Sequence, residues 1–112
     1  MTVTLDLGSL KLTAELFDTK VARAFYSHLP CTIELTLWGR EAYGPIPFDL
    51  GDEKPVPSIP PGGLAYTRKG NYFCIFFGQQ PAWAVEYIGQ IAGETWRSLV
   101  GKRDISRVTV MR

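Results

Sequence analysis

The chain has 112 residues, 46% of them hydrophobic and 21% charged, which fits one globular domain over residues 1–112 with a core of its own. Its net charge is only +1, and its basic residues are scattered along the sequence. Both observations argue against nucleic acid or an anionic membrane as a partner. No apolar run is long enough to cross a bilayer and no signal-peptide pattern opens the chain, so we expect a cytoplasmic protein.

The first 30 residues predict a β-hairpin followed by a helix. Apolar and polar residues alternate over 2–7 and again over 10–16, and Gly8-Ser9 between them is typical of a turn. From Asp18, a suitable N-cap, apolar residues recur with a helical period up to position 29, and Pro30 ends the helix. The only histidine, His28, lies near the end of this helix, where a structural role is favoured over that of a catalytic base.

The next predicted strand, 32–38, ends in an aromatic cluster. Trp38 stands where the alternation requires a polar residue, and the segment WGREAY (38–43) brings it close to Glu41 and Tyr43. Two interpretations stay open. Trp38 and Tyr43 cover the barrel wall while Arg40 and Glu41 are solvated, or the cluster forms an aromatic-lined site with one carboxylate at its edge.

Residues 44–63 contain six of the eight prolines and predict an ordered loop that wraps across the body. A short edge strand near 46–50 is expected within it. The acidic residues Asp49, Asp52 and Glu53 could form paired carboxylates with Glu41, but a solvated acidic loop is the simpler interpretation.

The segment 64–78 predicts the centre of the sheet. Residues 64–67 and 72–77 form a hairpin around a turn at 69–71, and the second strand is apolar at every position, so both of its faces should be covered. The loop after it carries Gln79, Gln80 and Trp83. Amides beside an aromatic ring suit a peptide-binding groove, and they are equally common in a plain surface loop.

The remaining residues predict a strand at 85–91, a short helix at 95–100 before Gly101, and a last strand at 107–111. Strands therefore dominate, with one helix after the second strand and one before the last. This order predicts a mainly β protein, a closed antiparallel barrel with two short helices capping its ends.

Few residues are candidates for catalysis or metal binding. Cys31 and Cys74 form no CxxC pair, and we expect reduced, buried thiols rather than a disulfide. With one histidine and no ligand spacing, neither a metal site nor a cofactor is expected. None of the common nucleotide-binding or hydrolase motifs is present.

Several segments together resemble the cyclophilins: LKLTAELFDTKVARAFYSHL (10–29), GLAYTRKGNYFCIFFG (63–78) and EYIGQIAGETWRSLVGKRDISRVTV (86–110). The short length, the WGREAY cluster and the proline-rich stretch after it are most similar to short prokaryotic cyclophilin-like proteins of unknown function. The resemblance covers most of the chain and implies a cyclophilin-like β-barrel.

Cyclophilins are peptidyl-prolyl isomerases, so the resemblance raises the question of catalysis. Their catalytic arginine lies in a Phe-His-Arg motif that this chain lacks; the nearest candidates are Arg40 and Arg68, and neither matches the motif. The resemblance further implies that Phe73 could line a proline pocket, with Trp83 as the candidate for the pocket tryptophan.

Two functions therefore remain open. The first is a domain that binds a peptide or small molecule in an aromatic groove, and the alternative is a weak peptidyl-prolyl isomerase. The candidate groove residues are Trp38, Glu41, Tyr43, Tyr66, Phe73, Phe77, Gln79 and Trp83. The sequence does not define an oligomeric state.

Overall fold

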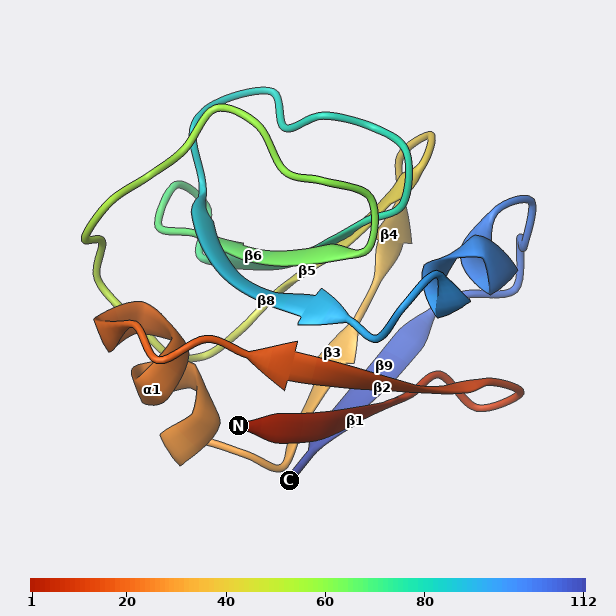
Figure 1. The fold of residues 1–112 in the computed structure, drawn as a ribbon, viewed down its shortest axis with the longest axis horizontal. Helices are drawn as coiled ribbons and strands as arrows, with labels where there is room; N and C mark the ends of the chain where they lie inside the picture. Colours follow the sequence, from red (N-terminus) through yellow and green to blue (C-terminus); the bar gives the residue numbers. More distant parts are fainter.

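The computed structural model describes residues 1–112 and has one antiparallel sheet of nine strands that curls into a nearly closed barrel (Figure 1). The order of strands across the sheet is β3-β9-β1-β2-β8-β6-β7-β5-β4. The strands are β1 (Thr2–Asp6), β2 (Lys11–Leu16), β3 (Cys31–Glu34), β4 (Thr36–Leu37), β5 (Glu41–Pro45), β6 (Gly63–Thr67), β7 (Tyr72–Phe76), β8 (Glu86–Ile91) and β9 (Arg107–Met111); the helices are α1 (Lys20–Ser27) and the 3-10 helix η1 (Thr95–Leu99).

The barrel has a seam that hydrogen-bonded strand pairing does not close, so the prediction of a fully closed barrel is too strong. The sheet ends at β3 and β4, which follow each other in the chain. The prediction of one strand over 32–38 is wrong because the chain changes partner at Leu35: β3 pairs with β9 and β4 pairs with β5. Gly44 of β5 lies against β3, since a Cβ there would be 1.9 Å from the Glu34 carbonyl oxygen. β3 therefore packs closely against the backbone of β5, the strand next to the short edge strand β4.

The predicted first helix is confirmed as α1, and the second is a 3-10 helix. Thr19, not Asp18, caps α1, because its Oγ1 accepts from the Ala22 N–H at 3.1 Å while the Asp18 carboxylate pairs with Arg23 at 2.7 Å. Within η1 the Ser98 hydroxyl donates to the Thr95 carbonyl at 2.7 Å. Neither helix has the length and apolar character that crossing a membrane would require.

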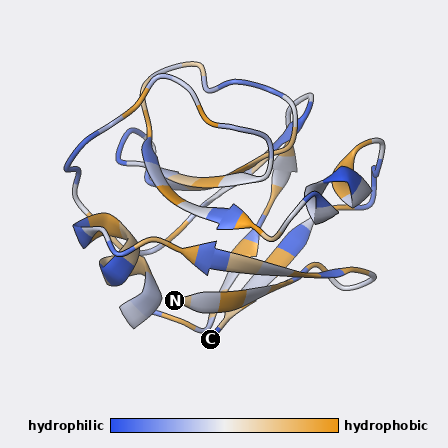
Figure 2. Ribbon diagram, in the orientation of Figure 1, coloured by the Kyte–Doolittle hydropathy of each residue, from blue (hydrophilic) through white to orange (hydrophobic).

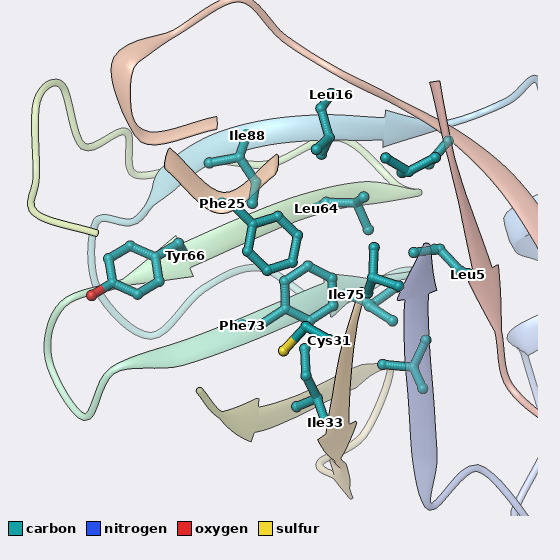
Figure 3. Packing of buried hydrophobic residues seen from close by; sticks show 14 of the residues in the cluster. Leu5, Leu16, Phe25, Cys31, Ile33, Leu64, Tyr66, Phe73, Ile75 and Ile88 are labelled. Atoms are coloured by element: carbon teal, nitrogen blue, oxygen red, sulfur yellow. The ribbon is translucent and has the colours of Figure 1, made fainter. Parts of the chain in front are cut away.

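The main core fills the barrel, and α1 covers one end of it. The helix carries both hydrophobic and hydrophilic residues (Figure 2), and its buried side consists of Val21, Ala22 and Phe25. The Phe25 ring stacks on that of Phe73 from β7, with centroids 5.1 Å apart and planes 13° from parallel (Figure 3). This stacked pair therefore packs α1 against the sheet at the centre of the core.

The prediction that both faces of the 72–77 strand are covered is confirmed. Phe73, Ile75 and Phe77 belong to the main core, while Cys74 and Phe76 belong to a second, smaller apolar cluster. Alternate residues of a strand point to opposite faces, so the second cluster lies on the outside of the barrel wall. The loops at 46–62 and 78–85 pass over this side of the sheet (Figure 1).

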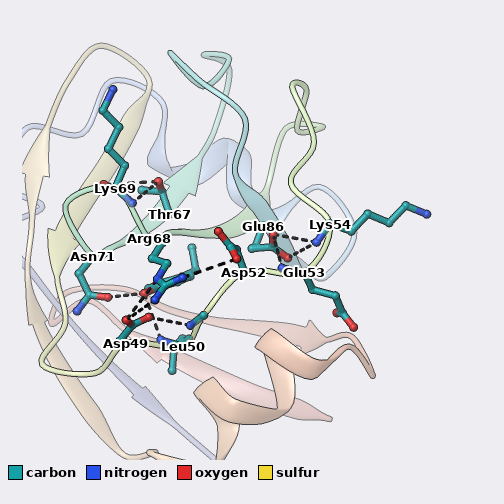
Figure 4. Close-up of polar contacts among 12 residues, drawn as sticks. Asp49, Leu50, Asp52, Glu53, Lys54, Thr67, Arg68, Lys69, Asn71 and Glu86 are labelled. Atoms are coloured by element: carbon teal, nitrogen blue, oxygen red, sulfur yellow. Dashed lines mark hydrogen bonds and ion pairs between the residues drawn. The ribbon is translucent and has the colours of Figure 1, made fainter.

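The 46–62 loop contains no strand at 46–50, contrary to expectation; its one sheet-like contact is a bridge between Val56 and Val85. Side chains hold the loop instead (Figure 4). The buried Glu86 carboxylate accepts from the backbone N–H groups of Glu53 and Lys54, at 3.0–3.2 Å. Arg68 pairs with Asp49 at 3.2 Å and with Asp52 at 3.9 Å. Most of the predicted acidic cluster therefore takes part in anchoring the loop.

Glu86→Gln is expected to loosen this loop, because an amide offers one acceptor oxygen where the carboxylate offers two. Hydrogen bonds to a charged group contribute about 1.5–3 kcal/mol each. We expect hydrogen exchange measured by NMR to become at least tenfold faster at the Glu53 and Lys54 amides. Glu94→Gln, at an exposed carboxylate beside η1, is the matched control. Unchanged exchange at both amides in Glu86→Gln would contradict the anchoring role.

Candidate functional site

A pocket of about 280 Å³ lies on the outside of the barrel wall, over β5 and β7. Five of its eleven lining residues are aromatic, and one is acidic. The residues that line it are Trp38, Glu41, Tyr43, Thr67, Tyr72, Cys74, Phe76, Pro81, Ala82, Trp83 and Val85.

The alternation of the strands determines which residues reach this pocket. In the register of β5 and β7, Glu41 lies opposite Phe76 and Tyr43 opposite Cys74. These four side chains share one face, and Tyr72 continues the row two residues before Cys74. The Tyr43 and Tyr72 rings meet edge to face, with centroids 5.2 Å apart. The wall of the pocket is therefore built on two adjacent, hydrogen-bonded strands, which makes it rigid.

A tight turn presents Trp38 and Glu41. The two residues exchange backbone hydrogen bonds of 2.8 and 3.2 Å across Gly39-Arg40, and Gly39 has a φ of +62°. Gln79 packs on this turn: its Oε1 accepts from the Arg40 N–H at 3.2 Å, and a Cβ on Gly39 would come within 2.0 Å of that oxygen. Gln79 thus supports the turn from outside the pocket lining.

Trp83 forms the other side of the pocket mouth, and two contacts fix its ring. The indole Nε1–H donates to the Thr67 hydroxyl at 2.8 Å. The Lys69 ammonium lies 4.3 Å from the centre of the ring, within the range of a cation–π interaction. Lys69 lines a neighbouring hollow of about 160 Å³ and not the aromatic pocket. Trp38 and Trp83 remain 53% and 41% exposed, so both indoles have free surface.

Glu41 is the only formally charged side chain in the lining, and it is 7% exposed. Burial raises the pKa of this carboxyl to about 7, and the neighbouring Cys74 thiol offsets part of that rise. No lysine, arginine or N-terminal amine forms an ion pair with it. The pocket thus contains one carboxyl group that changes charge near neutral pH among aromatic walls.

Four of the eight predicted groove residues come together in this pocket: Trp38, Glu41, Tyr43 and Trp83. Tyr66, Phe73 and Phe77 point into the main core instead. The missed lining residues, chiefly Tyr72, Cys74 and Phe76, carry a signal in the sequence. They have the opposite parity to Phe73 and Phe77 in the same strand, so strand alternation alone would have separated the two sets.

The two candidate arginines lie outside the pocket. Arg68 is paired with two carboxylates of the 46–62 loop. Arg40 lines a different surface hollow with Lys102 and Arg103. The aromatic pocket therefore contains no guanidinium group.

The two cysteines and the single histidine, the other residues that could take part in catalysis or metal binding, have structural roles. Cys31 and Cys74 are buried, free thiols, and burial raises the pKa of each. The His28 ring stacks on Phe48, with centroids 3.9 Å apart, so it helps to hold the 46–62 loop on the end of α1. No three histidine, cysteine, aspartate or glutamate side chains converge in a way that could hold a metal ion.

Comparison with known proteins gives the family. The Cyclophilin-like family model matches residues 1–111. The solution structure of the hypothetical protein AF2241 from Archaeoglobus fulgidus superposes with a TM-score of 0.81 at 27% identity, covering 100% of this chain and 94% of that one. The structure of McbB in complex with tryptophan has the same fold, with a TM-score of 0.76 at 14% identity, covering 98% of this chain and 44% of McbB. None of the curated proteins matches the sequence.

The family model spans nearly the whole chain, and the segments that resemble cyclophilins in sequence form the hairpins and helix of the barrel. The chain therefore belongs to the cyclophilin-like family.

Proposed function

We propose that this domain binds a small ligand in the aromatic pocket over β5 and β7. The observation that carries the proposal is the pocket itself, a 280 Å³ hollow with five aromatic side chains and one buried carboxyl on a rigid wall. Apolar walls with few polar groups are the usual composition of small-molecule sites. Its volume lies just below the range of about 300–1,000 Å³ that is usual for such sites, which favours a small occupant.

The state of the two loop amides favours a small ligand over an extended peptide. A peptide-binding groove needs free amides that can pair with the backbone of its ligand. Gln79 already accepts from the Arg40 N–H. Gln80 accepts from the Ile59 N–H and donates to the Ile59 carbonyl, both at 3.0 Å. The Gln80 amide is therefore paired through both its oxygen and its nitrogen, the Gln79 oxygen is paired as well, and neither side chain lines the pocket.

No specific observation favours the isomerase alternative. A cyclophilin-type mechanism requires an arginine beside an apolar pocket, and neither Arg40 nor Arg68 lines the aromatic pocket. Phe73, the expected wall of a proline pocket, is fully buried under Phe25. The aromatic pocket is thus a better basis for binding than for this form of catalysis.

Trp83→Ala provides the test. A library of small aromatic and amine fragments, titrated at up to millimolar concentration and followed by NMR shift mapping, should move the backbone signals of the pocket residues. We expect Trp83→Ala to weaken each hit at least tenfold, because one wall of the site is lost, and Trp83→Phe to weaken it less. Trp96→Phe, at a tryptophan outside the lining, is the control. Shifts that avoid the pocket residues, or no shift with any fragment, would overturn the proposal.

A further inference from the structure

The charge in the aromatic pocket is unbalanced, and this points to the class of ligand. The polar groups in the lining include the Glu41 carboxyl, the Tyr43 and Tyr72 hydroxyls and the Cys74 thiol. None of them provides a positive charge. The Lys69 ammonium contacts the lining through the Trp83 ring, but this lysine lines the adjacent hollow. A carboxylate in this pocket therefore has no positive partner from the chain.

The aromatic walls around Glu41 are suited to a bound cation, which would supply the positive charge that the chain does not. The faces of tryptophan and tyrosine rings carry negative electrostatic potential and attract cations, most strongly where water is excluded. An ammonium group with methyl substituents gains in addition from apolar contact, because its surface is mostly carbon. Lys69 on Trp83 shows that one of these rings already interacts with a cation in this molecule.

We propose that the pocket binds a small organic ammonium ion, with Glu41 as its counter-charge and Trp38, Trp83, Tyr43, Tyr72 and Phe76 as its walls. This assignment depends on the proposed small-ligand function and specifies the ligand class. The carboxylate pairs with the ammonium group, and the rings enclose its alkyl substituents. The occupant is a free small molecule, because the pocket is small and neither loop glutamine that could hold a peptide backbone lines it.

The test compares choline with its neutral carbon isostere, 3,3-dimethylbutan-1-ol, by isothermal titration calorimetry and NMR shift mapping. We expect choline to bind at least tenfold more tightly than the isostere, and Glu41→Gln to remove that preference. Glu34→Gln, at an exposed carboxylate of β3, should keep it. Glu41→Gln retains the shape of the side chain, so a loss of preference reports on the charge.

The pH dependence gives an independent readout. If ionised Glu41 is required and its pKa is about 7, the carboxylate fraction rises roughly tenfold between pH 6 and pH 8, and choline affinity should rise by about that factor. The affinity of the isostere should stay constant or fall over the same range. Choline binding that does not change with pH would count against Glu41 as the counter-charge.

The outcomes separate this assignment from the proposed function. Equal or tighter binding of the neutral isostere in the pocket would overturn the ammonium assignment and leave the small-ligand function standing. If the fragment library also fails to bind, both fall together. A trimethyl-lysine peptide that binds more than tenfold more tightly than choline would overturn the assignment to a free small molecule.

Discussion

Phe73→Ala is expected to lower the free energy of unfolding by about 3–5 kcal/mol, the usual cost of removing a fully buried phenylalanine. Phe73 is inaccessible to solvent and stacks on Phe25, so the substitution leaves a cavity between α1 and the sheet. A domain of this size is stable by about 5–15 kcal/mol in total, so the loss is a large share. Urea unfolding followed by circular dichroism measures it.

Trp38→Ala is the matched control, because it removes an even larger ring from the half-exposed rim of the pocket. Substitutions at exposed positions usually change stability by about 0.5 kcal/mol or less, and we expect a small change here. A loss at Phe73 no larger than the loss at Trp38 would mean that the packing of α1 on β7 contributes little to the stability of the fold. The two variants thus distinguish a core aromatic residue from a pocket aromatic residue.

Glu41→Gln is expected to stabilise the domain above neutral pH. The pKa of the Glu41 carboxyl is raised from 4.5 to about 7 by burial in the folded state. Below pH 4 both states hold the proton and the raised pKa has no effect on stability. Between about pH 4.5 and 7 the unfolded chain releases the proton while the folded chain keeps it, so wild-type stability falls as pH rises.

The size of this effect follows from the shift. At about 1.4 kcal/mol per pKa unit, the fall amounts to something on the order of 3 kcal/mol, complete above pH 7. Glutamine never ionises, so the advantage of Glu41→Gln over wild type should grow by that amount between pH 4 and pH 8. Urea unfolding at a series of pH values measures it, with Glu34→Gln as the exposed control. Parallel pH profiles for wild type and Glu41→Gln would show that the carboxyl titrates normally.

The fold could be predicted largely from the sequence because its strands have clear period-two patterns. The hairpin over the first 16 residues and the wholly apolar 72–77 strand both lie where the pattern placed them. The break at Leu35 could not be found this way. Its neighbours alternate without interruption, and the change of partner from β9 to β5 depends on how the two sheet edges meet. The short helix expected at 95–100 is present, in 3-10 form over Thr95–Leu99.

The candidate site could be predicted only in part, because residue type alone does not tell which face of a strand a side chain occupies. The aromatic cluster at 38–43 identified Trp38, Glu41 and Tyr43 through residue type alone. Phe73 and Phe77 are also aromatic, but strand alternation places them on the inner face, where they belong to the core. The burial of Glu41 is a tertiary property, because it depends on the loop around Trp83 and on the facing Phe76.

The distribution of the three tryptophans has a practical consequence. Trp38 and Trp83 stand at the mouth of the pocket, while Trp96 belongs to η1 and packs against the main core. Indole emission is sensitive to the polarity around the ring, and two of the three emitters in this chain border the same cavity. Their emission would therefore report on any molecule added to that cavity, and single Trp-to-Phe replacements would assign the signal to one rim or the other without an added dye.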